Sequence, residues 1–403
     1  MRVNSEWQVA WTLLLILYAL PALGAGTAPR VIGYLTESGV ESGHYTVKNI
    51  VMSGAAPLLT QIDYAFGRVV KNRCEIDNEE AALAHAYTAE TSVDGTADLG
   101  GADDPRGAFH QLLELKRKYP QLKVVISLGG WGGSSGFSNA ADPANVRNFV
   151  HSCVATFLQG RAAGVFDGVD IDWEYPVGGG LHHAGKPEDK KNFTAMLAEF
   201  RRQLDAIKPG LLLSAALPAG EEDFAHFELE KIGKYLDEVS IMAYDLHWNT
   251  ERITNFHSAL FHAAADPSDP SGQKRFGDYA VQAFLKAGIA PEKLILGVPF
   301  YGKGYAPVGD GNHGLYQPSV RPSKLDGSYR ALKALPGRAD RQYYPRVASC
   351  SVWLDGNFWS YDCPEAMKAK REYALRERLG GVMFWELSQD TDSSELLRAL
   401  AGR

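Results

Sequence analysis

The sequence predicts a (β/α)₈ TIM barrel that carries a small α+β insertion between its seventh and eighth strands. Two observations predict this fold class. Eight short apolar runs recur along the 403 residues, and amphipathic helical patterns separate them. Most of the runs are continuous rather than alternating, which is typical of parallel strands buried on both faces. Strands that alternate with helices in this number indicate a barrel.

The expected strands are short and rich in β-branched residues. They are Arg30–Thr36, Gln61–Gly67, Lys123–Gly129, Phe166–Glu174, Leu211–Leu217, Glu238–Asp245, Leu294–Tyr301 and Gly381–Leu387. Helical patterns with apolar residues three and four apart lie between them. The clearest are Arg106–Lys118, Pro143–Gln159, Pro187–Ala206, Lys274–Ala287 and Pro364–Leu379.

Two connections are too long to be simple loops of a barrel. Residues 68–104 are rich in Asp, Gly and Ala, and residues 303–362 are rich in Gly, Pro, Tyr and Trp. Structureless loops of that length are uncommon in compact domains. We therefore expect residues 303–362 to form the inserted α+β subdomain, within a barrel that takes up residues 25–403.

Residues 1–24 have the features of a secretory signal. The apolar run Trp11–Leu20 is followed by Pro21 and a stretch of small residues, which places the expected cleavage after Gly24. The run is too short to span a bilayer comfortably, so an uncleaved anchor is the weaker alternative. We expect an extracellular protein, or a periplasmic one, without stable membrane association.

Four cysteines remain after this leader, and export makes disulfides permissible. Cys350 and Cys363 are close in sequence and are the expected pair. Cys153 lies in a helical apolar pattern, which suggests a buried free thiol. Four cysteines allow three pairings with Cys74 included, and the sequence alone does not choose among them. No Cys/His spacing indicates zinc.

Composition and charge exclude several classes of protein. The chain is 45% hydrophobic and 22% charged, which excludes a disordered or fibrous protein. The formal net charge is −7 and no block of Lys and Arg stands out, so nucleic acid is not expected as a partner. We expect a monomer that uses neither a cofactor nor a metal.

The strongest local signal is a row of acidic residues on the fourth strand. Because side chains alternate along a strand, Asp170, Asp172 and Glu174 share one face and Trp173 lies on the other. The apolar face should pack on the helices, so the acids face the barrel interior. Asp167 has the opposite parity and is interpreted as a support for the strand's start. Glu174 comes last, at the carboxyl-terminal mouth where barrel active sites lie.

Three carboxylates on a buried strand face are costly unless they share protons or bind cations. Repulsion should raise at least one pKa, which suits a general acid. A solvated strand face is excluded by the apolar residues between the acids. A ladder for Mg²⁺ or Ca²⁺ is the other alternative, but no second cluster of acids or His follows the other strands.

Motifs at several strand ends then give a specific resemblance. The pattern DxxDxDxE matches at Asp167, Asp170, Asp172 and Glu174; SxGG matches at Ser127, Gly129 and Gly130; MxYD matches at Met242, Tyr244 and Asp245; and a Trp on the last strand matches Trp385. The chain resembles the family 18 glycoside hydrolases, the chitinase family, nearly from end to end of its mature part.

The resemblance implies roles for the acids. Glu174 would protonate the glycosidic oxygen and later act as base toward water, while the substrate's own N-acetyl oxygen attacks the anomeric carbon. Asp172 would stabilise the resulting oxazolinium ion, and Asp170 would hold a shared proton. Tyr244 would donate a hydrogen bond to the acetamido oxygen, and Asp245 would hold the sugar.

The resemblance also implies a sugar-binding cleft. Trp385 would form its floor, and Tyr34, Phe66 and Met242 would complete the wall. Three further residues at strand ends are expected to contact substrate, or to pack in loops or the core instead: Trp131, Trp248 and Tyr301. Lys303 stands where related enzymes commonly have Arg. Lys keeps the charge but lacks the planar fork of Arg, so no role in sugar recognition is assigned to Lys303.

The function implied is that of a chitinase, which hydrolyses β-1,4 links between N-acetylglucosamine units and binds chitin and its oligomers. Two alternatives remain on the same barrel. Endo-β-N-acetylglucosaminidases that act on N-glycan cores usually lack the insertion. Non-catalytic chitin-binding lectins typically lose the acid that Glu174 supplies here.

Overall fold

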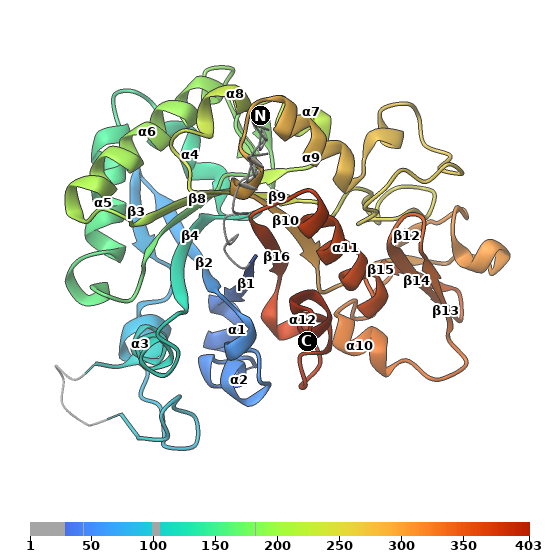
Figure 1. Cartoon of the computed structure of the whole chain (residues 1–403), viewed down its shortest axis with the longest axis horizontal. Helices are drawn as coiled ribbons and strands as arrows, with labels where there is room; N and C mark the ends of the chain where they lie inside the picture. Colours follow the sequence, from blue (N-terminus) through green and yellow to red (C-terminus); the bar gives the residue numbers. More distant parts are fainter. Residues whose placement is uncertain (1–28, 43, 99–104, 182) are drawn as a thin grey trace, which may run out of the picture.

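The computed structural model describes residues 29–42, 44–98, 105–181 and 183–403 (Figure 1). The expected leader, residues 1–24, lies outside the described residues. Among the helices in these ranges, none combines the length and the apolar character needed to cross a membrane.

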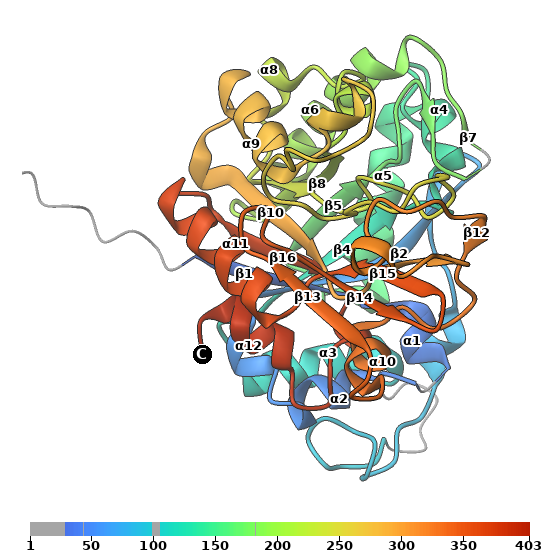
Figure 2. The ribbon, with the colours of Figure 1, turned by 90° about the vertical axis from the view of Figure 1, so that its right-hand side faces the viewer.

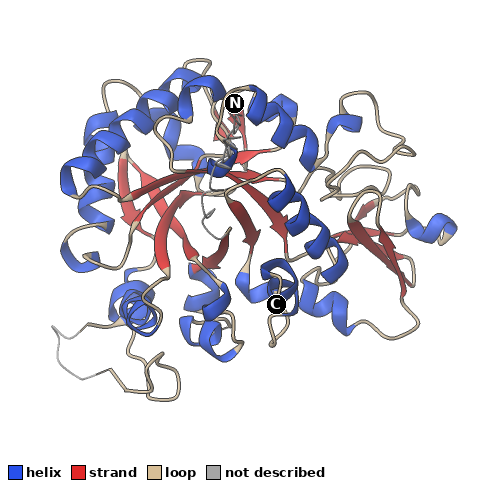
Figure 3. Ribbon diagram, viewed as in Figure 1, coloured by secondary structure: helices blue, strands red, loops and turns tan. Residues whose placement is uncertain are grey.

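Eight parallel strands form a closed barrel, which confirms the predicted fold class (Figure 3). They are β1 (Arg30–Thr36), β2 (Gln61–Val70), β4 (Lys123–Gly129), β5 (Gly168–Asp172), β8 (Leu212–Pro218), β9 (Glu238–Met242), β10 (Leu294–Pro299) and β16 (Gly381–Trp385). Each pairs with its neighbours in the order β1-β16-β10-β9-β8-β5-β4-β2, and pairing of β2 with β1 closes the ring.

The observed strands differ from the expected ones mainly at their carboxyl ends. The strand expected to reach Glu174 ends at Asp172, because its last partner on β4 is Gly129. Glu174 therefore lies just beyond the ladder, at the mouth. β2 runs further than expected, to Val70, because it forms an antiparallel hairpin with β3 (Arg73–Ile76).

Helices surround the barrel and cover its outer face. They are α1 (Glu37–Glu41), α2 (Val47–Met52), α3 (Gly107–Lys118), α4 (Phe137–Ala140), α5 (Val146–Phe157), α6 (Asp189–Ile207), α7 (Glu221–Phe224), α8 (Leu229–Ile232), α9 (Gly277–Lys286), α11 (Pro364–Arg376) and α12 (Glu395–Ala401). The main core lies between strands and helices. Trp173 is fully buried there and stacks on Phe137, with ring centroids 5.3 Å apart.

Between β10 and β16 the chain forms a separate antiparallel sheet (Figures 1 and 2). Its strands are β11 (Lys303–Ala306), β12 (Arg321–Pro322), β13 (Asp340–Tyr344), β14 (Ser349–Leu354) and β15 (Asn357–Tyr361), in the order β12-β11-β15-β14-β13, and α10 (Tyr329–Ala334) accompanies them. A two-residue pairing of β6 (Gly178–Gly179) with β7 (His183–Ala184) lies elsewhere, after β5.

A long connection between β9 and α9, residues 243–276, ties this inserted sheet to the barrel. Ile253 forms a β-bridge with Pro318, and the backbone N–H of Leu260 donates to the carbonyl of Val347. Phe256 of the connection shares a small apolar core with Tyr305 and Phe358 of the inserted sheet. This connection fixes the insertion beside the barrel mouth, although no pattern in the sequence indicated that role.

Two disulfides brace the structure. One joins Cys350 on β14 to Cys363, which precedes α11. The other joins Cys74 on β3 to Cys153 on α5, so the expectation of a free thiol at Cys153 is wrong. The apolar pattern correctly indicated that Cys153 is buried, but it carried no information on the hairpin that brings Cys74 onto the helix.

Removing the Cys74–Cys153 disulfide should destabilise the fold more than removing the Cys350–Cys363 disulfide. The sequence separations are 79 and 13 residues, and closing the longer loop restricts the unfolded chain more. We expect losses of about 4.5 and about 3 kcal/mol for the paired Cys→Ser variants. Urea denaturation of both variants measures this difference, and equal or reversed losses would contradict it.

Candidate active site

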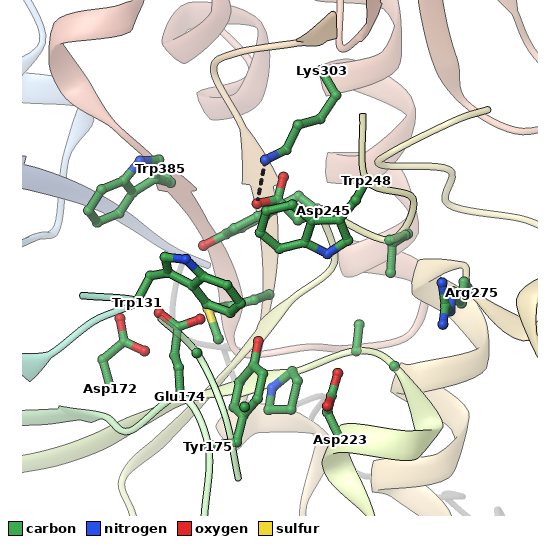
Figure 4. Close-up of a pocket in the computed structure, with 18 of the residues that line it drawn as sticks. Trp131, Asp172, Glu174, Tyr175, Asp223, Asp245, Trp248, Arg275, Lys303 and Trp385 are labelled. Carbon is green, nitrogen blue, oxygen red and sulfur yellow. Dashed lines mark ion pairs between the residues drawn. The ribbon is translucent and has the colours of Figure 1, made fainter. Parts of the chain in front are cut away.

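A pocket of about 630 Å³ opens at the carboxyl ends of the barrel strands (Figure 4). Every strand-end residue expected to act in the cleft lines it except Asp170, which lies buried beneath. The expected residues that line it are Tyr34, Phe66, Trp131, Asp172, Glu174, Met242, Tyr244, Asp245, Trp248, Tyr301 and Trp385. Lys303, to which the sequence assigned no role in sugar recognition, lines it as well.

Asp170 is fully buried and fully hydrogen-bonded. Its Oδ2 accepts hydrogen bonds from Ser127 Oγ at 2.7 Å and Tyr34 Oη at 3.0 Å, and its Oδ1 accepts one from Ser214 Oγ at 2.7 Å. Burial raises the pKa of Asp170, and these three donors partly offset the rise. The donors come from three different strands, so the barrel itself holds this carboxyl group in place.

Asp172 lies closer to the barrel mouth than Asp170 and has fewer hydrogen bonds to stabilise its charge. Burial raises its pKa well above the usual range, and the neighbouring carboxyl groups of Glu174, Asp170 and Asp63 raise it further. Its Oδ1 is buried and has no hydrogen-bond partner among the described residues. A buried acceptor without a hydrogen bond destabilises the free protein. A ligand that brings an N–H or O–H donor to this oxygen would remove that cost.

Glu174 is the outermost acid and faces the pocket. Burial, together with the charges of Asp245 and Asp223, raises its pKa to about 8, although a hydrogen bond with Tyr175 acts in the opposite direction. Its backbone N–H donates to Ser134 Oγ at 2.9 Å, which fixes the start of the loop. At neutral pH this carboxyl group therefore carries a proton that it can donate.

Two glycines, Gly129 at the end of β4 and Gly130 directly after it, let the next loop approach the acids closely. Both Gly129 and Gly130 have positive φ, and a Cβ at Gly129 would lie 2.3 Å from the carbonyl oxygen of Asp172. At Gly130 it would lie 2.5 Å from the ring of Phe66. The SxGG motif is thus explained by packing against both the acidic strand and an aromatic wall.

Aromatic rings form the part of the pocket next to Asp172. Trp385 stacks on Phe66 with ring centroids 5.6 Å apart, and Tyr34 lies 5.4 Å from Trp385 in a tilted arrangement. Tyr244 is packed against the same small cluster together with Met242. The arrangement provides an apolar face beside a buried acid, which suits a sugar ring.

Asp245 is the centre of a polar network on another wall. Its side chain accepts a hydrogen bond from Tyr301 Oη at 2.7 Å, lies 3.0 Å from Lys303 Nζ and lies 3.5 Å from His257 Nδ1. Burial favours a raised pKa for Asp245, but His257, Lys303 and Tyr301 outweigh it and hold the pKa below its usual range. Asp245 is therefore an anion at neutral pH.

Lys303 also contacts an aromatic ring. Its Nζ lies 4.2 Å from the centroid of the Trp248 ring, within range of a cation–π interaction. Trp248 in turn lies 5.1 Å from Trp131, whose side chain is 39% exposed. Although Lys lacks the planar fork of Arg, it links the anion of Asp245 to the two tryptophans at the pocket rim.

Several pocket residues were missed by the sequence analysis. Tyr175 follows the acidic motif directly, Asp223 follows the end of β8 by five residues, and Arg275 precedes α9. Buried His257 supports Asp245 from behind the wall. Tyr175 and Asp223 could have been found from their positions shortly after strand ends. Arg275 and His257 had no such signal, because they lie in the long connection of residues 243–276.

The site supplies carboxyl groups, hydroxyls and aromatic rings rather than a set of metal ligands. Within the described ranges, no three His, Cys, Asp or Glu residues are placed to hold a metal ion. What the arrangement can do chemically is donate a proton from Glu174 and stabilise a nearby cation with Asp172.

Similarity to known proteins agrees with this geometry. The family model described as "Glycosyl hydrolases family 18" matches residues 30–390. Chitinase C of Streptomyces lividans is 36% identical over 390 residues, which cover 93% of this chain and 59% of that protein. The chain thus spans about three fifths of this curated relative's length.

Solved structures show the same fold. The catalytic domain of psychrophilic chitinase B from Arthrobacter TAD20 superposes with a TM-score of 0.86 at 34% identity, covering 93% of this chain and 95% of that one. Chitinase ChiA74 from Bacillus thuringiensis gives a TM-score of 0.81 at 30% identity, covering 93% of this chain and 70% of that one. Together with the family match, the barrel and its acidic strand establish that this chain belongs to family 18 of the glycosyl hydrolases.

Proposed function

We propose that this protein is a chitinase that cleaves β-1,4 links between N-acetylglucosamine units with retention of configuration. The observation that carries the proposal is the acidic row at the carboxyl end of β5. Glu174, two residues beyond the strand, faces an aromatic pocket, and Asp172 has an oxygen with no hydrogen-bond partner among the described residues. The relatives named chitinases support the choice of substrate.

In the first step Glu174 gives its proton to the glycosidic oxygen as the bond to the anomeric carbon breaks. The acetamido oxygen of the same sugar forms the new bond to that carbon, so the protein supplies no nucleophile. The sugar becomes a positively charged oxazolinium ion, and the leaving chain departs as an alcohol.

Asp172 is the group placed to stabilise that ion. Its buried Oδ1 can accept the N–H of the acetamido group, and its charge offsets the positive charge of the ring that forms. Asp170 below is held by three hydroxyl donors and can retain a proton shared with Asp172. Transfer of that proton toward Asp170 would leave Asp172 as the anion.

In the second step water attacks the anomeric carbon on the face that the leaving group vacated. Glu174, now a carboxylate, removes a proton from the water, and the carbon–oxygen bond of the oxazolinium ring breaks to restore the acetamido group. Two inversions at the same carbon give net retention, and Glu174 is protonated again.

The inserted sheet and the connection of residues 243–276 form one side of the cleft. Lys303 at the start of β11 holds Asp245 and contacts Trp248, so the insertion contributes directly to the pocket wall. A deep wall of this kind favours long chains over short ones. It supports chitin over N-glycan cores as the substrate.

We also propose that residues 1–24 direct export and are removed. The disulfides Cys74–Cys153 and Cys350–Cys363 support this, because such bonds persist in oxidising compartments. We further propose that the exported enzyme works as a monomer, because the one pocket described above contains all the groups that the two steps use.

Replacing Glu174 with Gln should abolish hydrolysis of chitin oligomers while binding is retained. The amide has nearly the same shape but cannot donate a proton to the leaving oxygen, so we expect kcat to fall by roughly 10²- to 10⁴-fold. Product analysis on N-acetylglucosamine hexamer measures this loss. If the wild type is as inactive as the variant while both bind chitin, the protein is a lectin and the proposal is wrong.

Replacing Asp172 with Asn should lower kcat by roughly 10²- to 10³-fold with little change in KM. The amide keeps the size of the side chain but removes the charge that offsets the oxazolinium ion. Steady-state kinetics on the hexamer separate the two constants. Turnover close to that of the wild type would show that this carboxyl group does not stabilise the intermediate.

The pH profile of kcat/KM should have a basic limb near pH 8. Burial raises the pKa of Glu174 to about 8, so its catalytic proton is present below that pH and is lost as the pH rises through it. The profile of the wild-type enzyme on the hexamer measures the limb. A decline that begins near pH 5 would mean that Glu174 is ionised in the free enzyme and is not held as the acid.

A further inference from the structure

Three carboxyl groups that line the pocket, Glu222, Asp223 and Asp245, have no part in the two steps described above, and Asp223 differs from the other two. Asp223 on α7 lines the pocket, is half-buried and accepts no hydrogen bond from a side chain of the described residues. Burial and the charge of Glu222 raise its pKa, while His226 and Arg275 lower it less. The side chain remains reachable from the pocket.

The other pocket charges outside the catalytic row are already paired. Glu222 and Arg275 form an ion pair, and Lys303 pairs with Asp245. Arg275 is shared further with Glu251, 3.5 Å away. Asp223 is thus a carboxyl group without a cation within ion-pair distance in the described part of the chain, in a pocket where acids outnumber bases.

The position of Asp223 along the cleft follows from the mechanism. Asp172 must reach the acetamido group of the sugar that keeps the anomeric carbon, and Glu174 must reach the oxygen that leaves. Figure 4 shows Trp385 and Asp172 on one side of Glu174, and Asp223 and Arg275 on the other. Asp223 therefore lies on the side of the leaving chain.

We propose that Asp223 selects a protonated amino sugar, a glucosamine unit, in the leaving part of a partly N-deacetylated chain. This inference rests on the proposed function and names its preferred substrate class. An ammonium group is the complement of an unpaired, partly desolvated carboxylate, and a charge-assisted hydrogen bond between them is stronger than one to a neutral acetamido group. Successive β-1,4-linked sugars are turned over, so the 2-amino group of either the first or the second leaving sugar faces Asp223.

Limited digestion of a randomly N-acetylated chitosan, followed by sequencing of the products by mass spectrometry, tests this selection. At one of the first two positions of the new non-reducing ends, we expect the ratio of glucosamine to N-acetylglucosamine to exceed the ratio in the starting polymer by about three- to tenfold. This is the scale of one net hydrogen bond that stays partly exposed to water. The enrichment should decline as salt is added, because salt screens partly exposed charges. The ratio is internal to one digest and is independent of the overall rate.

Asp223→Asn should reduce the enrichment to near random, and Asp223→Glu should retain part of it. Glu221→Gln is the matched control, because Glu221 lies on the same helix, pairs with Lys274 at 2.8 Å and does not line the pocket. It should keep both the enrichment and the activity. If Asp223→Asn fails to fold, as judged by its unfolding midpoint, the salt series on the wild type decides the question.

Two failures are distinguishable. If the wild type leaves fully acetylated hexamer uncut, the proposed function itself is wrong. If it cuts the hexamer but gives random composition at both positions, or if Asp223→Asn or high salt leaves the enrichment unchanged, only the role of Asp223 is wrong.

Discussion

The constraint on which the active site depends is the free-energy cost of burying several carboxyl groups inside a barrel. Removing Asp170, Asp172 and Glu174 from water disfavours their charged forms, and their proximity adds repulsion. Hydroxyl donors on three strands relieve much of that cost at Asp170, whereas Glu174 has one such hydrogen bond, with Tyr175. The two acids above it are left poorly satisfied, one with a raised pKa and one with an unpartnered oxygen. Both properties are what the proposed chemistry uses, since the first provides an acid and the second an acceptor for the substrate's N–H.

The rest of the fold excludes water from these carboxyl groups and provides an aromatic surface on which a sugar ring can pack. Trp385, Phe66 and Tyr34 pack together at the mouth, and the two glycines at the end of β4 bring the neighbouring loop against Phe66. On the other wall the anion of Asp245 is held by groups from three segments, which include the inserted sheet. The insertion is therefore part of the active site's construction and not an appendage, because its first strand supplies Lys303.

The barrel strands and the acidic row could be predicted from sequence because both are local patterns. Continuous apolar runs mark buried parallel strands, and parity along one strand places Asp170, Asp172 and Glu174 together and Trp173 in the core. What could not be predicted depends on contacts between distant segments. The partner of Cys153 comes from a hairpin that the pattern did not show, and His257 lies in a connection whose packing against the insertion has no local signature. A strand ends where the neighbouring strand no longer offers a pairing partner. This explains why β5 ends at Asp172, before the end of the strand expected from the sequence.

Burial keeps Glu174 protonated at neutral pH, and the proposed chemistry depends on this proton. A ¹³C NMR titration of glutamate carboxyl groups tests it most directly, with the Glu174 signal assigned by its loss in Glu174→Gln. We expect a midpoint near pH 8, because burial raises the pKa of Glu174 to about 8. A midpoint near the ordinary value of 4.5 would contradict it, since the group would then be an anion before substrate binds and could not donate the proton.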